Sequence, residues 1–150
     1  MKSKILVKGA ITGFLVAVMG NIIFTTIQEV YFISEFGWLT IRLFLTFFGG
    51  LGLITIPSLL FGLLLANILY EDLLQKRLKV PNAIIRGGVL GFIAAIEMCS
   101  VALIVFKNAT INILLWYIIE AFSLATLCGA YVGKNLAKFI LKMKPDLQSG

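Results

Sequence analysis

The chain has no histidine, only two cysteines and only seven acidic residues among its 150. Without histidine it lacks a frequent ligand of zinc and haem and the commonest general base. Cys99 and Cys128 lie inside apolar segments. Their depths differ by about 10 Å at a helical rise of about 1.5 Å per residue, too far apart for a disulfide. Because no nucleophile motif compensates for these absences, we expect no metal, no cofactor and no enzymatic activity.

Charged residues are also scarce, at 13% of the chain, whereas hydrophobic residues make up 60%. The mean hydropathy is +1.03, and a soluble domain has only about 45–50% apolar residues. Four apolar segments are long enough to cross a bilayer as helices of about 20 residues each: 9–28, 43–66, 87–106 and 113–133. The sequence therefore predicts an all-α membrane protein in which residues 1–150 form a single transmembrane bundle.

The basic residues gather at one end of the predicted spans. They precede the first span, separate the second from the third and follow the fourth: Lys2, Lys4, Lys8, Lys76, Arg77, Lys79, Arg86, Lys134, Lys138, Lys142 and Lys144. Only Arg42 and Lys107 lie on the other side. The positive-inside bias places both termini and the loop 71–86 on the cytoplasmic side of the membrane. We expect this membrane to be a bacterial-type inner (plasma) membrane. This orientation explains the net charge of +6, so we expect no nucleic-acid partner.

A basic segment, 134–144, follows the last span. Lys134, Lys138 and Lys142 are four residues apart and share one helical face, before Pro145 ends the helix. We expect this amphipathic segment to lie along the cytoplasmic surface of the membrane.

Two stretches of the chain resemble one another. In "VKGAITGFLVAV" (7–18) and "IRGGVLGFIAAI" (85–96), the basic residue, both glycines and the phenylalanine coincide. Small residues four apart also recur in the second and fourth spans: Ser58, Gly62 and Ala66, then Ala121, Ala125, Gly129 and Gly133. We infer two helical hairpins of the same orientation, a parallel repeat about an axis along the membrane normal. The small residues, which include Gly9, Gly13, Gly87 and Gly91, predict close helix packing.

Few polar side chains lie within the spans. Counting helical rises places four of them near the centre of a hydrocarbon core about 30 Å thick: Glu97, Asn21, Thr55 and Ser58. In the second span, three glycines and a proline predict a kink that leaves the Leu53 carbonyl without its helical donor: Gly49, Gly50, Gly52 and Pro57. We expect a neutral Glu97 to donate to that carbonyl. Glu120 lies nearer the outer face, where Arg42 or Lys107 is its expected charge partner.

A carboxylate at the bilayer centre favours a functional role, because a charge there costs about 2.5–3.5 kcal/mol. One hypothesis is a transporter or channel subunit with a proton or cation site comprising Glu97, Asn21, Thr55, Ser58 and Glu120. The alternative is a non-catalytic structural or assembly subunit of a larger membrane complex, in which a neutral glutamate only joins helices, a contact worth about 0.6 kcal/mol. The expected partners are the lipid bilayer and either a second copy or other membrane subunits.

Overall fold

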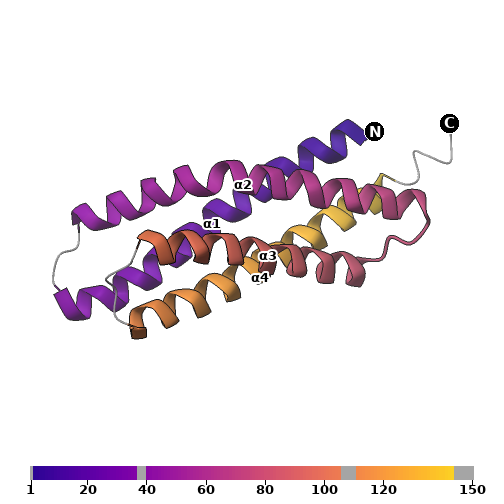
Figure 1. Ribbon diagram of the computed structural model, residues 1–150. Helices are drawn as coiled ribbons and strands as arrows, with labels where there is room; N and C mark the ends of the chain where they lie inside the picture. Colours follow the sequence, from indigo (N-terminus) through magenta and orange to yellow (C-terminus); the bar gives the residue numbers. More distant parts are fainter. Residues whose placement is uncertain (1, 37–39, 106–110, 144–150) are drawn as a thin grey trace.

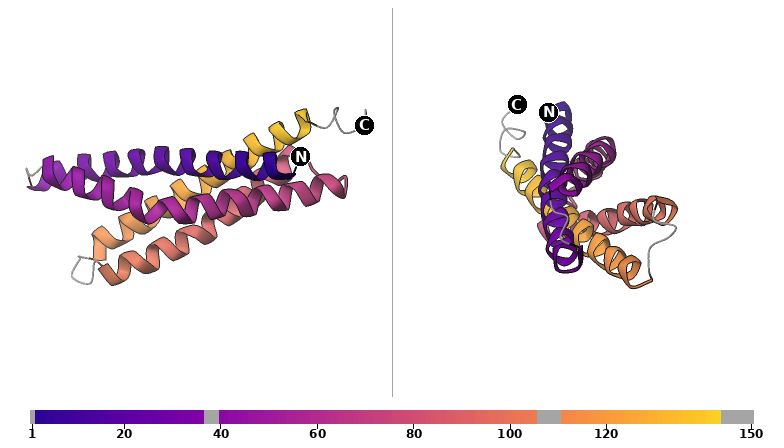
Figure 2. Two further views of the ribbon diagram at one scale, coloured as in Figure 1. Left: turned by 90° about the horizontal axis from the view of Figure 1, so that it is seen from above. Right: turned by 90° about the vertical axis from the view of Figure 1, so that its left-hand side faces the viewer.

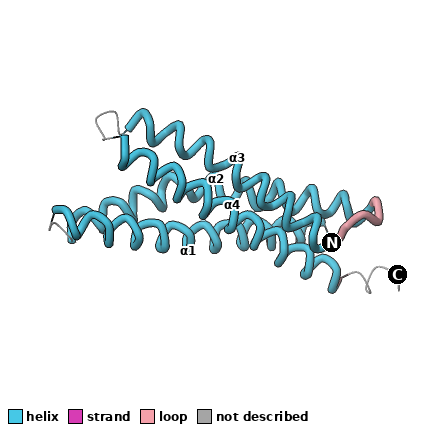
Figure 3. The backbone as a smooth tube through the Cα atoms, turned by 90° about the horizontal axis from the view of Figure 1, so that it is seen from below, coloured by secondary structure: helices cyan, strands magenta, loops and turns pink. Residues whose placement is uncertain are grey.

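Four α-helices make up nearly all of the described chain. The computed structural model describes residues 2–36, 40–105 and 111–143, with side chains for 2–27, 55–96, 99–100, 115 and 117–143. The helices are α1 (Lys2–Phe36), α2 (Thr40–Leu74), α3 (Val80–Val105) and α4 (Ile111–Lys142), and no strand occurs in the described ranges. They run up and down, so α1 begins and α4 ends at the same end of the molecule (Figures 1 and 3). The all-α prediction is confirmed.

Two of the helices are long and apolar enough to cross a membrane. Among the residues with described side chains, the qualifying stretches are Lys2–Ile27 in α1 and Thr55–Leu74 in α2, and α3 contributes a shorter apolar stretch, Val80–Ile96. By length and composition, these stretches suggest an association with a membrane.

Glycines set the distance between the helices of each hairpin. In the first hairpin, a Cβ built on Gly13 of α1 would lie 2.7 Å from the backbone oxygen of Ser58 in α2. In the second, a Cβ on Gly91 of α3 would collide with the backbone oxygen of Ala125 in α4. The six glycines predicted as packing residues all lie at these two crossings: Gly9, Gly13, Gly87, Gly91, Gly129 and Gly133. The small-residue stripes therefore face the partner helix of the same hairpin.

One buried apolar cluster joins all four helices near the end where α1 begins. Its members are Ile5, Leu65, Ala66, Leu69, Ala83, Val132, Leu136, Ala137 and Ile140. Toward the opposite end, the hairpin of α1 and α2 diverges from the hairpin of α3 and α4 (Figure 2). The shared core of the molecule thus lies at the end that carries most of the lysines.

The last turns of α4 differ from the expected surface segment. The helix runs unbroken from Ile111 to Lys142, and Leu136, Ala137 and Ile140 are at most 1% exposed. The residues assigned from the sequence to the membrane surface instead continue α4. Their apolar face fills the core because α1 and α2 extend far enough to cover it.

The predicted kink falls in a helix without a break. α2 continues through Pro57 as a single helix. Gly49, Gly50, Gly52 and Leu53 precede the part of α2 with described side chains, which begins at residue 55. The kink and the freed Leu53 carbonyl therefore stay predictions.

Candidate functional site

Glu97 is the leading candidate from the sequence, and its side chain lies outside those described. Its backbone is in α3, two residues before the buried Cys99. The bond expected between Glu97 and the Leu53 carbonyl stays a prediction.

Ser58 belongs to the crossing of α1 and α2. It is 9% exposed, its backbone abuts Gly13, and its hydroxyl donates to the Thr55 carbonyl at 3.0 Å. Asn21 lies eight residues beyond Gly13 on α1, which corresponds to about 12 Å along a helix. The structure therefore places Ser58 and Asn21 at different levels and does not bring them together in one layer.

Glu120 lies where α4 approaches α1 and α3. One of its carboxyl oxygens, Oε1, is buried. Tyr117, one turn earlier, packs edge-on against Phe24 of α1 with ring centroids 5.1 Å apart, and it is within electrostatic reach of Glu120 and of Cys99 on α3. We call Tyr117, Glu120 and Cys99, which come from α4 and α3, the junction cluster.

Two further polar side chains lie between α1 and α4 or close to that contact, and the sequence gives neither of them a site role. Thr25 is 2% exposed, and its Oγ1 has no hydrogen-bond partner within the described part of the chain. Cys128 packs against α1, with its Sγ 3.9 Å from the Val16 carbonyl oxygen. Threonine and cysteine carry no sequence signal that distinguishes such positions from ordinary helix contacts, so only the packing reveals them.

An ion pair between a buried aspartate and a partly exposed arginine joins the two hairpins at the end where the shared core lies. Arg86 of α3 donates through Nη1 to Oδ2 of Asp72 in α2, and Asp72 is only 6% exposed. In the sequence, Arg86 is only an orientation marker, and no pattern points to Asp72.

The end of α2 fixes the direction of the chain toward α3. Lys76 has a φ of 55°, its N–H donates to the Leu73 carbonyl at 3.0 Å, and the Arg77 N–H donates to the Asp72 carbonyl at 2.8 Å. These bonds form a Schellman cap, in which glycine usually takes the left-handed position. The cap and the ion pair both hold Asp72 in place.

Removing the cation of this pair should lower the stability of the protein. Arg86→Ala leaves the Asp72 carboxylate buried without its charged donor, a loss of about 1.5–3 kcal/mol for a charged hydrogen bond. We expect the lower end of that range because the Arg86 side chain is 43% exposed. Chemical unfolding in detergent micelles measures the change, with Lys79→Ala, which removes an exposed charge just before α3, as the control. Equal stability of the two variants would contradict the role assigned to the pair.

The described residues contain no group of three or more histidine, cysteine, aspartate or glutamate side chains that could hold a metal ion. Comparison of the chain with protein families, with curated proteins and with solved structures gave no match. A functional proposal therefore rests on the residues of this chain alone.

Proposed function

We propose that the chain is a multi-pass membrane protein in which all four helices cross the bilayer. The support is the number of large apolar side chains on the outside of each helix. Examples are Ile11, Leu15, Leu60, Ile93 and Ile119, each at least 48% exposed. Lipid tails would cover these side chains, whereas water would leave an apolar surface of a size that is rare on soluble monomers.

We also propose that the two hairpins are a parallel repeat. Adding 78 to each residue number in α1 and 67 to each residue number in α2 converts the contacts of the first hairpin into those of the second. Gly9 with Gly62 becomes Gly87 with Gly129, and Gly13 with Ser58 becomes Gly91 with Ala125. The same offsets pair core residues: Leu65 with Val132 and Leu69 with Leu136. Chance similarity of apolar sequence would not be expected to reproduce these pairings, so the contacts support the repeat.

The orientation of this bundle can be tested by chemical labelling. With the lysine-rich end in the cytoplasm, Ser34→Cys should react with a membrane-impermeant maleimide from outside intact cells, and Gln75→Cys should react only after lysis. The two native cysteines are first replaced by alanine. The reverse labelling pattern would overturn the orientation, and labelling of both sites in intact cells would contradict the transmembrane arrangement.

For function, we propose a proton- or cation-linked transporter or channel subunit. The observation that carries the proposal is the buried carboxyl oxygen of Glu120 between helices that are predominantly apolar. A carboxyl group can take up and release a proton or bind a cation, and such groups inside membranes usually mark an ion pathway. Glu97, one of the central polar residues in the sequence, is the second carboxyl of this proposed pathway.

Reconstitution tests the transport proposal directly. Purified protein is inserted into liposomes that contain a pH-sensitive dye, and a potassium diffusion potential is imposed with valinomycin. We expect protons to enter faster than in protein-free liposomes. A sodium tracer, measured in vesicles without valinomycin, reports cation movement. Protein that is inserted in a single orientation but leaves both fluxes at the protein-free level would contradict the proposal.

The alternative is a structural or assembly subunit of a larger membrane complex. It is favoured by the apolar faces of α2 and α3, which stay exposed where the hairpins diverge: Ile56, Leu60, Ile93 and Ile96. Gentle extraction followed by native mass measurement separates the two functions. A stable complex with other chains, together with absent flux, would support the subunit.

A further inference from the structure

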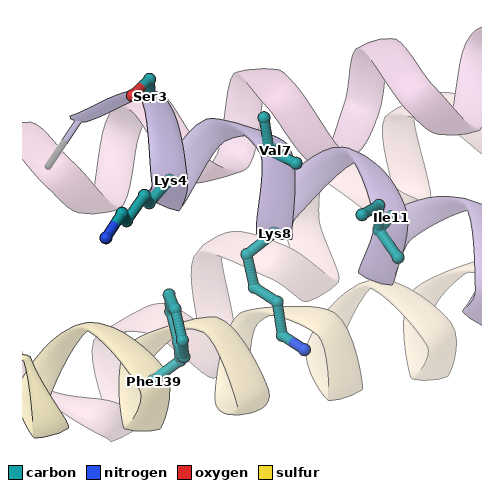
Figure 4. A pocket seen from close by; sticks show the side chains of 6 residues that line it. All are labelled: Ser3, Lys4, Val7, Lys8, Ile11 and Phe139. Carbon is teal, nitrogen blue, oxygen red and sulfur yellow. The ribbon is translucent and has the colours of Figure 1, made fainter.

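A groove with basic side chains lies between α1 and α4, where the two hairpins meet near the shared core. It has a volume of about 540 Å³, and its lining includes Lys8, Ile11, Leu15, Lys138, Phe139 and Lys142. A smaller hollow of about 330 Å³ adjoins it and adds Lys4. In Figure 4, Phe139 rises from α4 between the side chains of Lys4 and Lys8, which reach down from α1. Neither lining contains an acidic residue.

The other junction between the hairpins, where α3 meets α2, differs in charge. The offsets of the proposed repeat convert Lys8 into Arg86 and relate Asp72 to Phe139. Arg86 binds Asp72, whereas the ammonium of Lys8 lies 5.8 Å from the centroid of the Phe139 ring. Two corresponding contacts therefore contain a cation, but only one contains a carboxylate.

The neighbouring position strengthens this contrast. Lys138 of α4 corresponds to Glu71 of α2 under the same offset, and Glu71 accepts a hydrogen bond from Asn67 at 3.0 Å. The α1–α4 groove thus has a lysine and an aromatic ring where its counterpart has two acids. A cation–π contact at an exposed site is worth only about 0.5–1 kcal/mol, so the Phe139 ring does not replace a carboxylate as a partner of Lys8. An anion from outside the chain would therefore be attracted to this groove.

The apolar residues of the groove indicate what kind of anion fits. Ile11 and Leu15 follow Lys8 along α1 at about one and two turns, in the direction of the proposed membrane interior. On α4, the order from the interior is Tyr131, Asn135, then Lys138 and Lys142. The α1 wall therefore changes from apolar to cationic, and the α4 wall from uncharged to cationic, at the same end. A membrane lipid has the matching order of acyl chain and phosphate, and basic pockets between helices on the cytoplasmic side are typical sites for anionic headgroups.

We propose that this groove binds an anionic phospholipid of the cytoplasmic leaflet. Its phosphate contacts Lys8, Lys138 and Lys142, and one acyl chain lies along Ile11 and Leu15. The lipid supplies at this junction the negative charge that Asp72 supplies at the other. The inference rests on the proposed membrane placement and repeat, and it does not depend on transport.

Lipid titration of the delipidated protein in an uncharged detergent tests the proposal. Native mass spectrometry counts bound lipids, and a thermal melt records stabilisation. We expect phosphatidylglycerol to stay bound and raise the melting temperature by several degrees, and phosphatidylcholine or inorganic phosphate to do neither. Lys8→Gln with Lys138→Gln should weaken phosphatidylglycerol binding at least tenfold. Lys76→Gln with Lys79→Gln, the same charge change outside the groove, should not.

A second variant tests the comparison of the two junctions. Phe139→Asp places a carboxylate opposite Lys8, as Asp72 stands opposite Arg86, and should make the melting temperature independent of phosphatidylglycerol.

Unchanged lipid preference in the Lys8 and Lys138 double variant would overturn the proposal. So would an equal loss in the control pair, or stabilisation by phosphate alone. Lipid binding without flux in reconstituted vesicles would refute transport only, whereas failure to insert into bilayers would refute both.

Discussion

Gly91→Ala should melt well below the wild type, while Gly88→Ala, three residues away on the same helix, should melt at or above it. A Cβ on Gly91 would collide with the backbone oxygen of Ala125, which cannot move without displacing α4. A Cβ on Gly88 would meet the Thr126 and Ala130 side chains at 3.7 and 3.8 Å, which is ordinary contact. Replacing glycine by alanine within a helix gains about 1 kcal/mol, whereas overfilling a packed contact costs about 1–3 kcal/mol or more.

Gly88→Ala is therefore a matched control for the crossing of α3 and α4. The free energy of unfolding, measured in mixed micelles by titration with a denaturing detergent, should fall by up to about 2 kcal/mol in Gly91→Ala once the helix gain is subtracted. Gly13→Ala should also lower it, because its Cβ would lie 2.7 Å from the Ser58 carbonyl oxygen. If Gly91→Ala is as stable as Gly88→Ala, then α3 and α4 are not packed at the distance described.

The sequence predicts the helices and the residues of close approach, because both leave a periodic pattern. Stretches of about 20 apolar residues indicate spanning helices, and glycines four residues apart indicate a face with room for another backbone. The pattern does not say which helix fills that room. Only the contacts assign Gly9 and Gly13 to α2, and Gly87 and Gly91 to α4.

Helix ends were harder to predict, because hydropathy marks the membrane boundary and not the end of the helix. The hydropathy pattern predicts that the second span ends at residue 66, yet α2 continues to Leu74 with Glu71 and Asp72 inside it. The residue at the left-handed position of its cap is Lys76, where a glycine would have signalled the end. The sequence therefore lacks the usual signal for the end of this helix.

The polar residues show a similar limit. Depth counted from the ends of the predicted spans placed Ser58 and Asn21 in one layer, but the contact of Ser58 with Gly13 fixes a different register for α1 and α2. In the sequence, the lysines indicate the orientation of the chain in the membrane. The same lysine can also bind a ligand, and the sequence pattern does not distinguish the two roles. Whether Lys8 faces a carboxylate or a ring depends on the residue opposite it, which the sequence cannot supply without the fold.

In reconstituted vesicles, Glu97→Gln and Glu120→Gln should each reduce proton or cation flux more than tenfold while leaving the protein folded. Glutamine has the shape of glutamate and keeps its hydrogen bonding, but it cannot ionise. It therefore removes proton transfer and cation binding without removing contacts. Glu71→Gln is the matched control, because Glu71 is exposed and bonded to Asn67 at 3.0 Å near the end of α2. Its flux should equal that of the wild type.

Leucine substitutions at the same positions separate transport from stability. Glu120→Leu removes a carboxyl with a buried oxygen and leaves its polar neighbours short of a partner, at a cost of about 1–3 kcal/mol in the free energy of unfolding. A carboxyl that only joins helices would show this stability loss in the leucine variant and full flux in the glutamine variant. Full flux in both glutamine variants would therefore reassign the carboxyls to structural contacts, and the transport proposal would fail even if the wild-type vesicles conduct.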